Sequence, residues 1–431
     1  KSGQSKAYKP QKKVIFYERS IPYLFEGYGI EMEYMIVHNE TLSVLPISDQ
    51  ILYSIAGEFV EDVERGPIAW SNELVLHLIE LKTNGPSPLL EGLPEKFQTS
   101  IAEINQILSS KHGQLLGSGM HPWMNPTKEM QLWPHGYNEV YETYDRIFNC
   151  RHHGFSNLQS THLNLPFAND EELGRLHAAI RLILPILPAL SASSPVMEEK
   201  LSGKRDTRLD IYRKNQIKVP SIAGKIIPEQ VFTRREYEEK IFHRIWNDIA
   251  PYDPKGLLRY EWLNSRGAIV RFDRYAIEIR ILDIQECPLA DLSIMALIVQ
   301  LLKALVSEEW ISYEKQKSWP VEALEPLFLA CIQDAENTVI SDISYLQTLG
   351  ISSAKSCTAG DVWKQLTDRL FQKDQDRFAQ RWKPALDIIF NQGTLSTRII
   401  KALNNDLSRE NLRHVYRKLS HCLSKGTLFT A

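Results

Sequence analysis

The stretch Gly27–Val37, GYGIEMEYMIV, indicates the fold class of this chain. Acidic and large apolar residues alternate along it, so that Ile30 and Met32 fall on one face of an extended segment and Glu31 and Glu33 on the other. A period of two residues is typical of a β-strand with one buried face. The stretch therefore predicts a strand that carries two carboxylates side by side.

A second segment, Ala69–Thr83 (AWSNELVLHLIELKT), is a candidate pair of strands that ends at the Asn84-Gly85-Pro86 turn signal. Its periodicity leaves two interpretations open. In a helix, Glu73, His77 and Glu80 would share one face. In a strand, Glu73 and Glu80 point to opposite sides unless a bend intervenes.

The rest of the chain adds helices and strands in mixed order. Apolar periodicity predicts helices over residues 94–110 and 137–151, strands over 114–118 and 158–165, and a hairpin over 268–284 that turns near Asp273 and Arg274. From about residue 289 onward, long apolar-periodic runs predict a helical C-terminal third. We expect an α+β protein with a disordered tail over residues 1–13, a catalytic domain over 14–290 and a helical region over 291–431 packed on the same domain.

Composition limits the classes of function. The chain has 431 residues, 43% hydrophobic and 24% charged, which is typical of a globular protein. A near balance of 50 basic and 53 acidic residues argues against a general nucleic-acid binder. We expect no membrane span, because no window approaches the roughly 18 to 20 apolar residues that a span requires. Five scattered cysteines without a CxxC pair predict a reduced, cytoplasmic setting, and a homo-oligomer is left open.

Acidic or imidazole groups lie inside otherwise apolar, strand-like sequence at six positions: Glu31, Glu33, Glu73, Glu80, His162 and Glu278. Burial of such charges costs several kcal/mol each unless they are paired or bind a metal. Each residue alone has an ordinary explanation, such as a solvent-facing strand, a structural histidine or a surface ion pair. Together they favour a site for two or three divalent cations, and oxygen-rich ligands with one nitrogen suit Mg²⁺ or Mn²⁺.

Basic residues gather in GKRDTRLDIYRK, and three of them, Lys204, Arg208 and Arg213, are candidates to hold an ATP phosphate or an acidic substrate. A solvent-exposed basic loop would have the same sequence. The segment Gly117-Ser118-Gly119 predicts a tight turn but matches no Walker or dinucleotide motif. We interpret Cys150 and Cys287 as core or peripheral thiols rather than catalysts.

Seven blocks of sequence resemble a known family: GIEMEYMIV, ELVLHLIELKT, GSGMHP, THLNL, ALSASSPVM, DTRLDIYR and AIEIRILD. Their order and spacing over about residues 28–300 are similar to those of glutamate-cysteine ligase type 2 and the carboxylate-amine ligases, in the glutamine-synthetase-like superfamily. The resemblance implies a curved antiparallel sheet lined with metal-binding acids, with helices outside. One block departs from the family, because Ser160-Thr161-His162 stands where members often carry H-x-H.

The resemblance also implies a chemistry. The six acidic and imidazole residues would bind the Mg²⁺ or Mn²⁺ ions that bridge ATP, with Glu278 and Arg280 as catalytic residues and Arg280 near the transferring phosphoryl group. The expected reaction phosphorylates glutamate or a similar carboxylate and joins it to an amine such as cysteine, as in glutathione biosynthesis. The alternatives are a guanidino-kinase-like phosphotransferase and a catalytically degenerate protein that binds ATP or metal for regulation.

Overall fold

One large antiparallel sheet organises the protein. The computed structural model describes residues 21–352, 355–371 and 377–431, so the predicted tail over residues 1–13 lies outside the described residues. Eight strands form the sheet in the order β2-β3-β4-β1-β6-β10-β9, and β5 also pairs with β1. Their bounds are β1 Gly29–His38, β2 Asp62–Arg65, β3 Ile68–Asn72, β4 Leu78–Thr83, β5 Gly113–Leu116, β6 Ser160–Pro166, β9 Ala268–Arg271 and β10 Ala276–Asp283.

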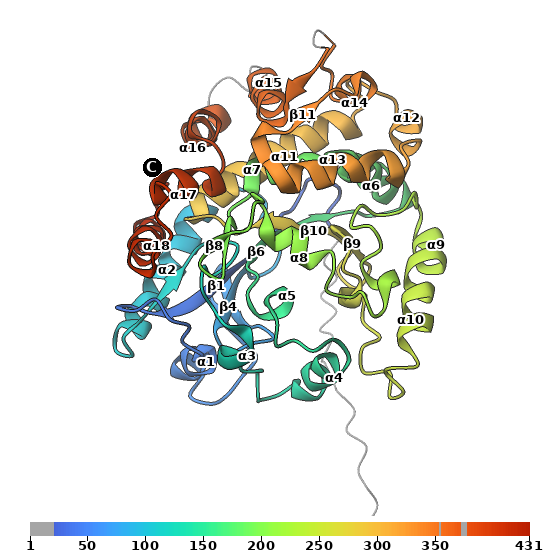
Figure 1. Cartoon of the computed structure of the whole chain (residues 1–431). Helices are drawn as coiled ribbons and strands as arrows, with labels where there is room; N and C mark the ends of the chain where they lie inside the picture. Colours follow the sequence, from blue (N-terminus) through green and yellow to red (C-terminus); the bar gives the residue numbers. More distant parts are fainter. Residues whose placement is uncertain (1–20, 353–354, 372–376) are drawn as a thin grey trace, which may run out of the picture.

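Helices cover the outside of this sheet (Figure 1). The longer ones are α1 Ser48–Ala56, α2 Leu93–Ser109, α4 Asn138–Phe148, α6 Asp170–Ile183, α11 Pro288–Val306, α13 Val321–Asp334, α15 Ala359–Phe371, α16 Phe378–Gln392, α17 Leu395–Leu403 and α18 Arg409–Lys425. Shorter elements are α3 Pro126–Glu129, α5 His153–Ser156, α7 Pro188–Ser191, α8 Thr207–Tyr212, α9 Arg234–Tyr237, α10 His243–Ile249, α12 Tyr313–Lys317, α14 Ile343–Thr348, β7 Val196–Met197, β8 Lys200–Leu201, β11 Val339–Ile340 and β12 Cys357–Thr358. The predicted α+β class is confirmed.

Strand β1 forms because its two faces differ in polarity. Ile30, Met32 and Tyr34 are fully buried, whereas Glu31 and Glu33 on the opposite face remain partly accessible. The side chains alternate between a core face and a polar face. The buried face of β1 belongs to a core that continues into the C-terminal helices.

Helix α11 corrects one expectation from the sequence. Its 19 residues are long and apolar enough to cross a membrane by length and composition, although no such window was predicted. However, 78% of its most apolar stretch is buried inside the protein. The helix packs against α2, α6, α7, α15 and α16, so its apolar character is explained by burial on all sides.

The C-terminal helices contact the earlier part of the chain directly. Helix α18 packs against α2 and β5, and Gln98 in α2 donates a hydrogen bond of 2.8 Å to the carbonyl oxygen of Leu423. Arg398 in α17 forms an ion pair with Glu286, and both side chains are fully buried. Glu286 also accepts a hydrogen bond of 3.1 Å from the backbone nitrogen of Phe429. These contacts join the chain after residue 290 to the sheet.

Buried histidines predict a loss of stability in acid. Burial lowers the pKa of His77 and of His121 to about 4 and that of His177 to about 3. In the unfolded chain the histidine pKa is about 6.5. At a pH between the native and the unfolded pKa of each histidine, the unfolded state therefore binds more protons than the native state. Their stabilising contribution is therefore complete above about pH 6.5 and falls by up to about 1.4 kcal/mol per histidine for each pH unit below it.

Urea unfolding of the parental protein and of His77→Gln at about pH 7.5 and about pH 5.5 checks this expectation, because groups with raised pKa values, such as His162 and Glu73, act in the opposite direction in both proteins. The change of midpoint between the two pH values should be less favourable to stability at the lower pH in the parental protein than in His77→Gln, and equal changes would contradict the expectation.

Candidate active site

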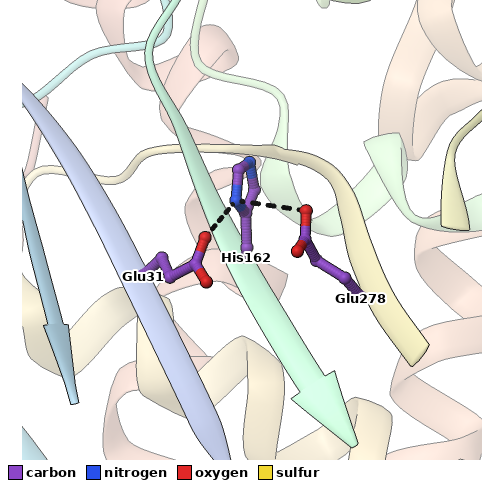
Figure 2. Close-up of side chains that lie close together, drawn as sticks. All are labelled: Glu31, His162 and Glu278. Atoms are coloured by element: carbon purple, nitrogen blue, oxygen red, sulfur yellow. Dashed lines mark hydrogen bonds and ion pairs between the residues drawn. The ribbon is translucent and has the colours of Figure 1, made fainter. Parts of the chain in front are cut away.

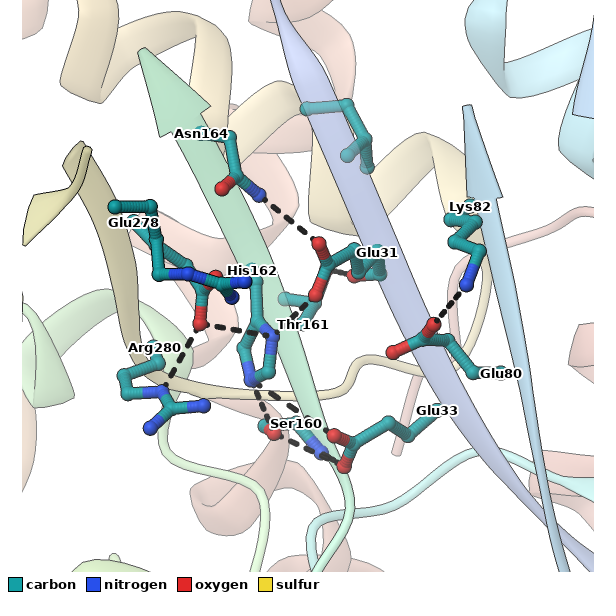
Figure 3. A network of polar contacts seen from close by, with 12 residues as sticks. Glu31, Glu33, Glu80, Lys82, Ser160, Thr161, His162, Asn164, Glu278 and Arg280 are labelled. Atoms are coloured by element: carbon teal, nitrogen blue, oxygen red, sulfur yellow. Dashed lines mark hydrogen bonds and ion pairs between the residues drawn. The ribbon is translucent and has the colours of Figure 1, made fainter. Parts of the chain in front are cut away.

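The strand register brings the predicted acidic residues to one region of the sheet. Glu31 in β1 lies opposite Lys82 in β4 and His162 in β6. Glu33 lies opposite Glu80 in β4. Glu278 in β10 lies opposite Asn164 in β6, so four adjacent strands contribute polar side chains (Figure 3).

Glu31, His162 and Glu278 form a first triad (Figure 2). Nδ1 of His162 lies 2.8 Å from Oε2 of Glu31 and 3.8 Å from Oε1 of Glu278. One ligand atom from each residue lies within 4.8 Å of the others. The side chain of Glu278 is only 2% exposed. Three side chains of the kind that bind metals therefore converge at a largely buried position.

Glu33, Glu73 and Glu80 form a second triad with the same 4.8 Å spacing. Glu73 lies in the turn between β3 and β4, so a bend brings it to the same side as Glu80. His77 does not join the triad, because its Nε2 bonds to the carbonyl oxygen of Ser156 at 2.6 Å. The strand interpretation of this segment is thus correct and the helical one is wrong.

His162 connects the two triads. Its Nε2 lies 3.8 Å from Oε1 of Glu33, while its Nδ1 faces the first triad. Ser160 stands in the position where the related motif has another histidine, and its hydroxyl lies 2.9 Å from Nε2 of His162 and donates to Oε2 of Glu33 at 3.0 Å. All six acidic and imidazole residues that the sequence singles out are thus brought together.

The carboxylates of the second triad compete for ionisation. Burial, with the nearby charges of Glu80 and Glu33, raises the pKa of Glu73 well above its usual value. Burial and Glu80 also raise the pKa of Glu33. Burial opposes ionisation of Glu80 too, but Lys82 and the Ser71 hydroxyl lower its pKa to about 2.

The first triad is closer to charge balance. Burial opposes a charged imidazole, but the hydrogen bond to Glu31 and the charges of Glu278 and Glu33 raise the pKa of His162. Burial likewise opposes an ionised Glu278, and Arg280 and His162 lower its pKa. Five carboxylates and one imidazole, arranged in two groups of three, fit the donor set of Mg²⁺ or Mn²⁺.

Cationic side chains surround the triads, and three of them are not among the residues predicted from the sequence. Nζ of Lys82 lies 3.2 Å from Oε1 of Glu80. Nη1 of Arg271 lies 3.5 Å from Oε2 of Glu278, and Nη1 of Arg274 lies 3.5 Å from Oε1 of Glu31. A signal existed for Lys82, which follows Glu80 by two residues and so shares its face of a strand.

The same spacing could have indicated two further residues of β6. Ser160 and Asn164 each lie two residues from His162, and residues at that spacing project from the same face of a strand. Nδ2 of Asn164 donates to Oε1 of Glu31 at 3.2 Å. These neutral side chains orient the acids of the first and second triads.

The predicted basic residues lie in different places. Nε of Arg280 lies 3.1 Å from Oε1 of Glu278, so Arg280 belongs to the site. Arg208 is only 2% exposed and forms an ion pair with Asp283. Lys204 and Arg213 instead gather around Asp210, and Lys204 also donates to Oε1 of Gln333 at 3.0 Å. Within the described residues, neither is brought together with the triads, and their proposed role at a phosphate stays a prediction.

The cysteines lie apart from this arrangement. Cys150 and Cys287 are fully buried, and burial raises the pKa of both thiols. Both are therefore held in the protonated form, which is a poor nucleophile.

The sequence matches known proteins over most of its length. Residues 28–417 match the family described as Glutamate-cysteine ligase family 2 (GCS2). An uncharacterized protein of Archaeoglobus fulgidus is 32% identical over 401 residues, which cover 93% of this chain and 99% of that protein. A protein of a Nocardioides species named putative glutamate–cysteine ligase 2-1 is 26% identical over 188 residues, 44% of each chain.

Two solved structures share the fold. A bifunctional glutathione synthetase from Pasteurella multocida superposes with a TM-score of 0.53 at 12% identity and is matched over 92% of this chain and 53% of its own, so the present chain spans about half its length. Glutamate–cysteine ligase from Francisella tularensis, in complex with AMP, gives a TM-score of 0.52 at 14% identity over 93% of this chain and 89% of that one. The expected glutamine-synthetase-like fold is confirmed.

The family match over most of the sequence and the 32% identity to the Archaeoglobus protein lead to the same conclusion. This chain belongs to glutamate-cysteine ligase family 2, a family of carboxylate-amine ligases.

Proposed function

We propose that this protein is an ATP-dependent carboxylate-amine ligase that joins the γ-carboxyl group of glutamate, or a similar carboxylate, to an amine such as cysteine. In this reaction ATP phosphorylates the carboxylate, the amine attacks the resulting acyl phosphate, and phosphate leaves. The observation that carries the proposal is the pair of acidic triads joined by His162 in a member of this family.

The residues of the site have distinct roles in this proposal. The triads of Glu31, His162 and Glu278 and of Glu33, Glu73 and Glu80 would hold divalent cations. Bound Mg²⁺ or Mn²⁺ supplies Lewis-acid stabilisation of charge on phosphoryl oxygens. Arg280, fixed on Glu278, would face the transferring phosphoryl group and neutralise the charge that develops there. No side-chain nucleophile is required.

In the decisive experiment, the protein is incubated with glutamate, cysteine, ATP and Mg²⁺. Phosphate release is measured, and the products are identified by mass spectrometry. We expect phosphate in equal amount to a γ-glutamyl amide, and loss of both when EDTA removes the metal. A stable phosphorylated metabolite would instead identify a kinase. Nucleotide binding without turnover over a panel of carboxylates and amines would identify a regulatory protein and contradict the proposal.

A further inference from the structure

Strand β10 contains a β-bulge at the site. Ile279 pairs with Leu163 and Leu282 pairs with Thr161, so Arg280 and Ile281 of β10 together face the single residue His162 of β6. A bulge of this kind inserts one extra residue, interrupts the regular ladder and changes the direction of the side chains around it. The bulge therefore decides where Arg280 lies relative to His162.

Arg208 contacts β10 within this bulge and just after it. Its Nε donates to Oδ1 of Asp283, and its Nη2 donates to the backbone carbonyl oxygen of Arg280 over a long distance of 3.4 Å. The backbone nitrogen of Arg280 donates to the carbonyl oxygen of Gly267 at 3.0 Å, so this residue is held from the β9 side. The guanidinium of Arg208 adds a donor at the carbonyl oxygen of the same residue.

Asp283 is itself fixed by a dense set of donors. Its Oδ2 accepts hydrogen bonds from the backbone nitrogen of Ser193 at 2.9 Å and from the hydroxyl of Ser194 at 2.7 Å. The Ser194 hydroxyl also accepts a bond of 3.0 Å from the backbone nitrogen of Arg208. Gly119 packs so closely that a Cβ there would lie 2.5 Å from Oδ2 of Asp283. Arg208 and Asp283 are therefore held in one rigid, buried arrangement.

We propose that Arg208 and Asp283 are positioning residues that clamp the bulge and so aim Arg280 at the reacting phosphoryl group. This inference rests on the proposed function, because it assigns Arg280 that target. Arg208 is 2% exposed, and two of its three guanidinium nitrogens are already engaged by Asp283 and Arg280. Its side chain is buried and its charge is paired with Asp283, so we assign it a role that acts through Arg280.

The test compares Arg208→Lys and Asp283→Asn with a matched control, Arg181→Lys. Arg181 is also buried and likewise uses two guanidinium nitrogens, which donate to the backbone carbonyl oxygens of Pro228 and Trp319, but its contacts are with other parts of the chain. Lysine at position 208 keeps the charge that balances Asp283. Its single ammonium group cannot replace the separate nitrogens that contact Asp283 and the carbonyl oxygen of Arg280. Asparagine at position 283 keeps the shape and removes the ion pair.

We expect both variants to lower kcat by about 10- to 100-fold while the dissociation constant of a non-hydrolysable ATP analogue with Mg²⁺, measured by calorimetry, changes less than about twofold. Arg181→Lys should retain the parental kcat. The double variant should be no slower than the slower single variant, because both changes break the same clamp. A loss of analogue affinity of about tenfold or more in Arg208→Lys alone would show a direct phosphate contact and overturn the proposal.

Hydrogen exchange of the peptide that covers residues 278–283 provides a readout independent of activity. We expect faster exchange in Arg208→Lys and Asp283→Asn than in the parental protein and in Arg181→Lys. Unchanged exchange would overturn the clamp even if the parental protein proved inactive. Parental inactivity accompanied by faster exchange in the variants would reject the proposed ligase activity and retain the clamp as a structural device.

Discussion

Replacing Glu278 with glutamine is expected to abolish turnover and leave the fold intact. Glutamine keeps the size of the side chain and can still bond to Arg280, which lies 3.1 Å away, but it removes the negative charge from the first triad. Metal ions contribute several kcal/mol of stabilisation to developing charge, so we expect a loss of ~10³-fold or more in kcat. Phosphate release with the identified substrates measures the effect.

Two additional measurements identify the cause of this loss. Calorimetric titration with Mn²⁺ should show weaker metal binding in Glu278→Gln. The matched control is Glu229→Gln, because Glu229 also forms an ion pair with an arginine, Arg266, but has no hydrogen bond or ion pair with a residue of either triad among the described residues. The control should turn over at the parental rate. Parental phosphate release in Glu278→Gln would show that the metal assignment is wrong.

Replacing Arg280 with lysine should retain ATP binding but lower kcat by about 10²-fold or more, because lysine keeps the charge yet lacks the planar fork of the guanidinium. In the structure Arg280 uses Nε for Glu278 and Nη1 for the carbonyl oxygen of Asn264 at 3.1 Å. These bonds fix the plane of the guanidinium beside the first triad. An ammonium group at the same position cannot make both.

Steady-state kinetics distinguish the two kinds of contact that Arg280 could make. A contact made mainly in the transition state lowers kcat and kcat/KM together, whereas a ground-state contact chiefly raises KM. We expect the first pattern. Parental turnover in Arg280→Lys would leave the residue with only a structural role and would require withdrawal of its assignment to catalysis.

Much of this site is predictable from local sequence. The alternation around Glu31 and Glu33 identifies a strand with one acidic face, and the hairpin near Asp273 is located correctly. The acidic residues stand out because charged side chains within apolar strands are costly to bury unless they are paired or bind a metal. Period-two spacing also places Lys82 on the face of Glu80 and Ser160 on the face of His162, so both residues are predictable in the same way.

Other features depend on which strands become neighbours. Arg208 and Asp283 are 75 positions apart, and nothing local to either residue indicates that they pair. The bulge opposite His162 exists only when β10 and β6 are aligned, so its effect on Arg280 cannot be predicted from the spacing of Glu278 and Arg280 alone. The sequence around Glu73 is compatible with a helix or with two strands joined by a bend, and the pairing of β3 with β4 selects the bend.

The alternation of β1 also constrains how the protein can fold. A slip of one residue in the pairing of β1 would turn Glu31 and Glu33 into the apolar interior and Ile30 and Met32 towards the polar side. Such a slipped arrangement would bury two uncompensated carboxylates, which costs several kcal/mol for each. Glu31 and Glu33 therefore disfavour misregistered pairing of β1. A variant that replaces both residues with apolar ones should lose this protection against mispairing as well as activity.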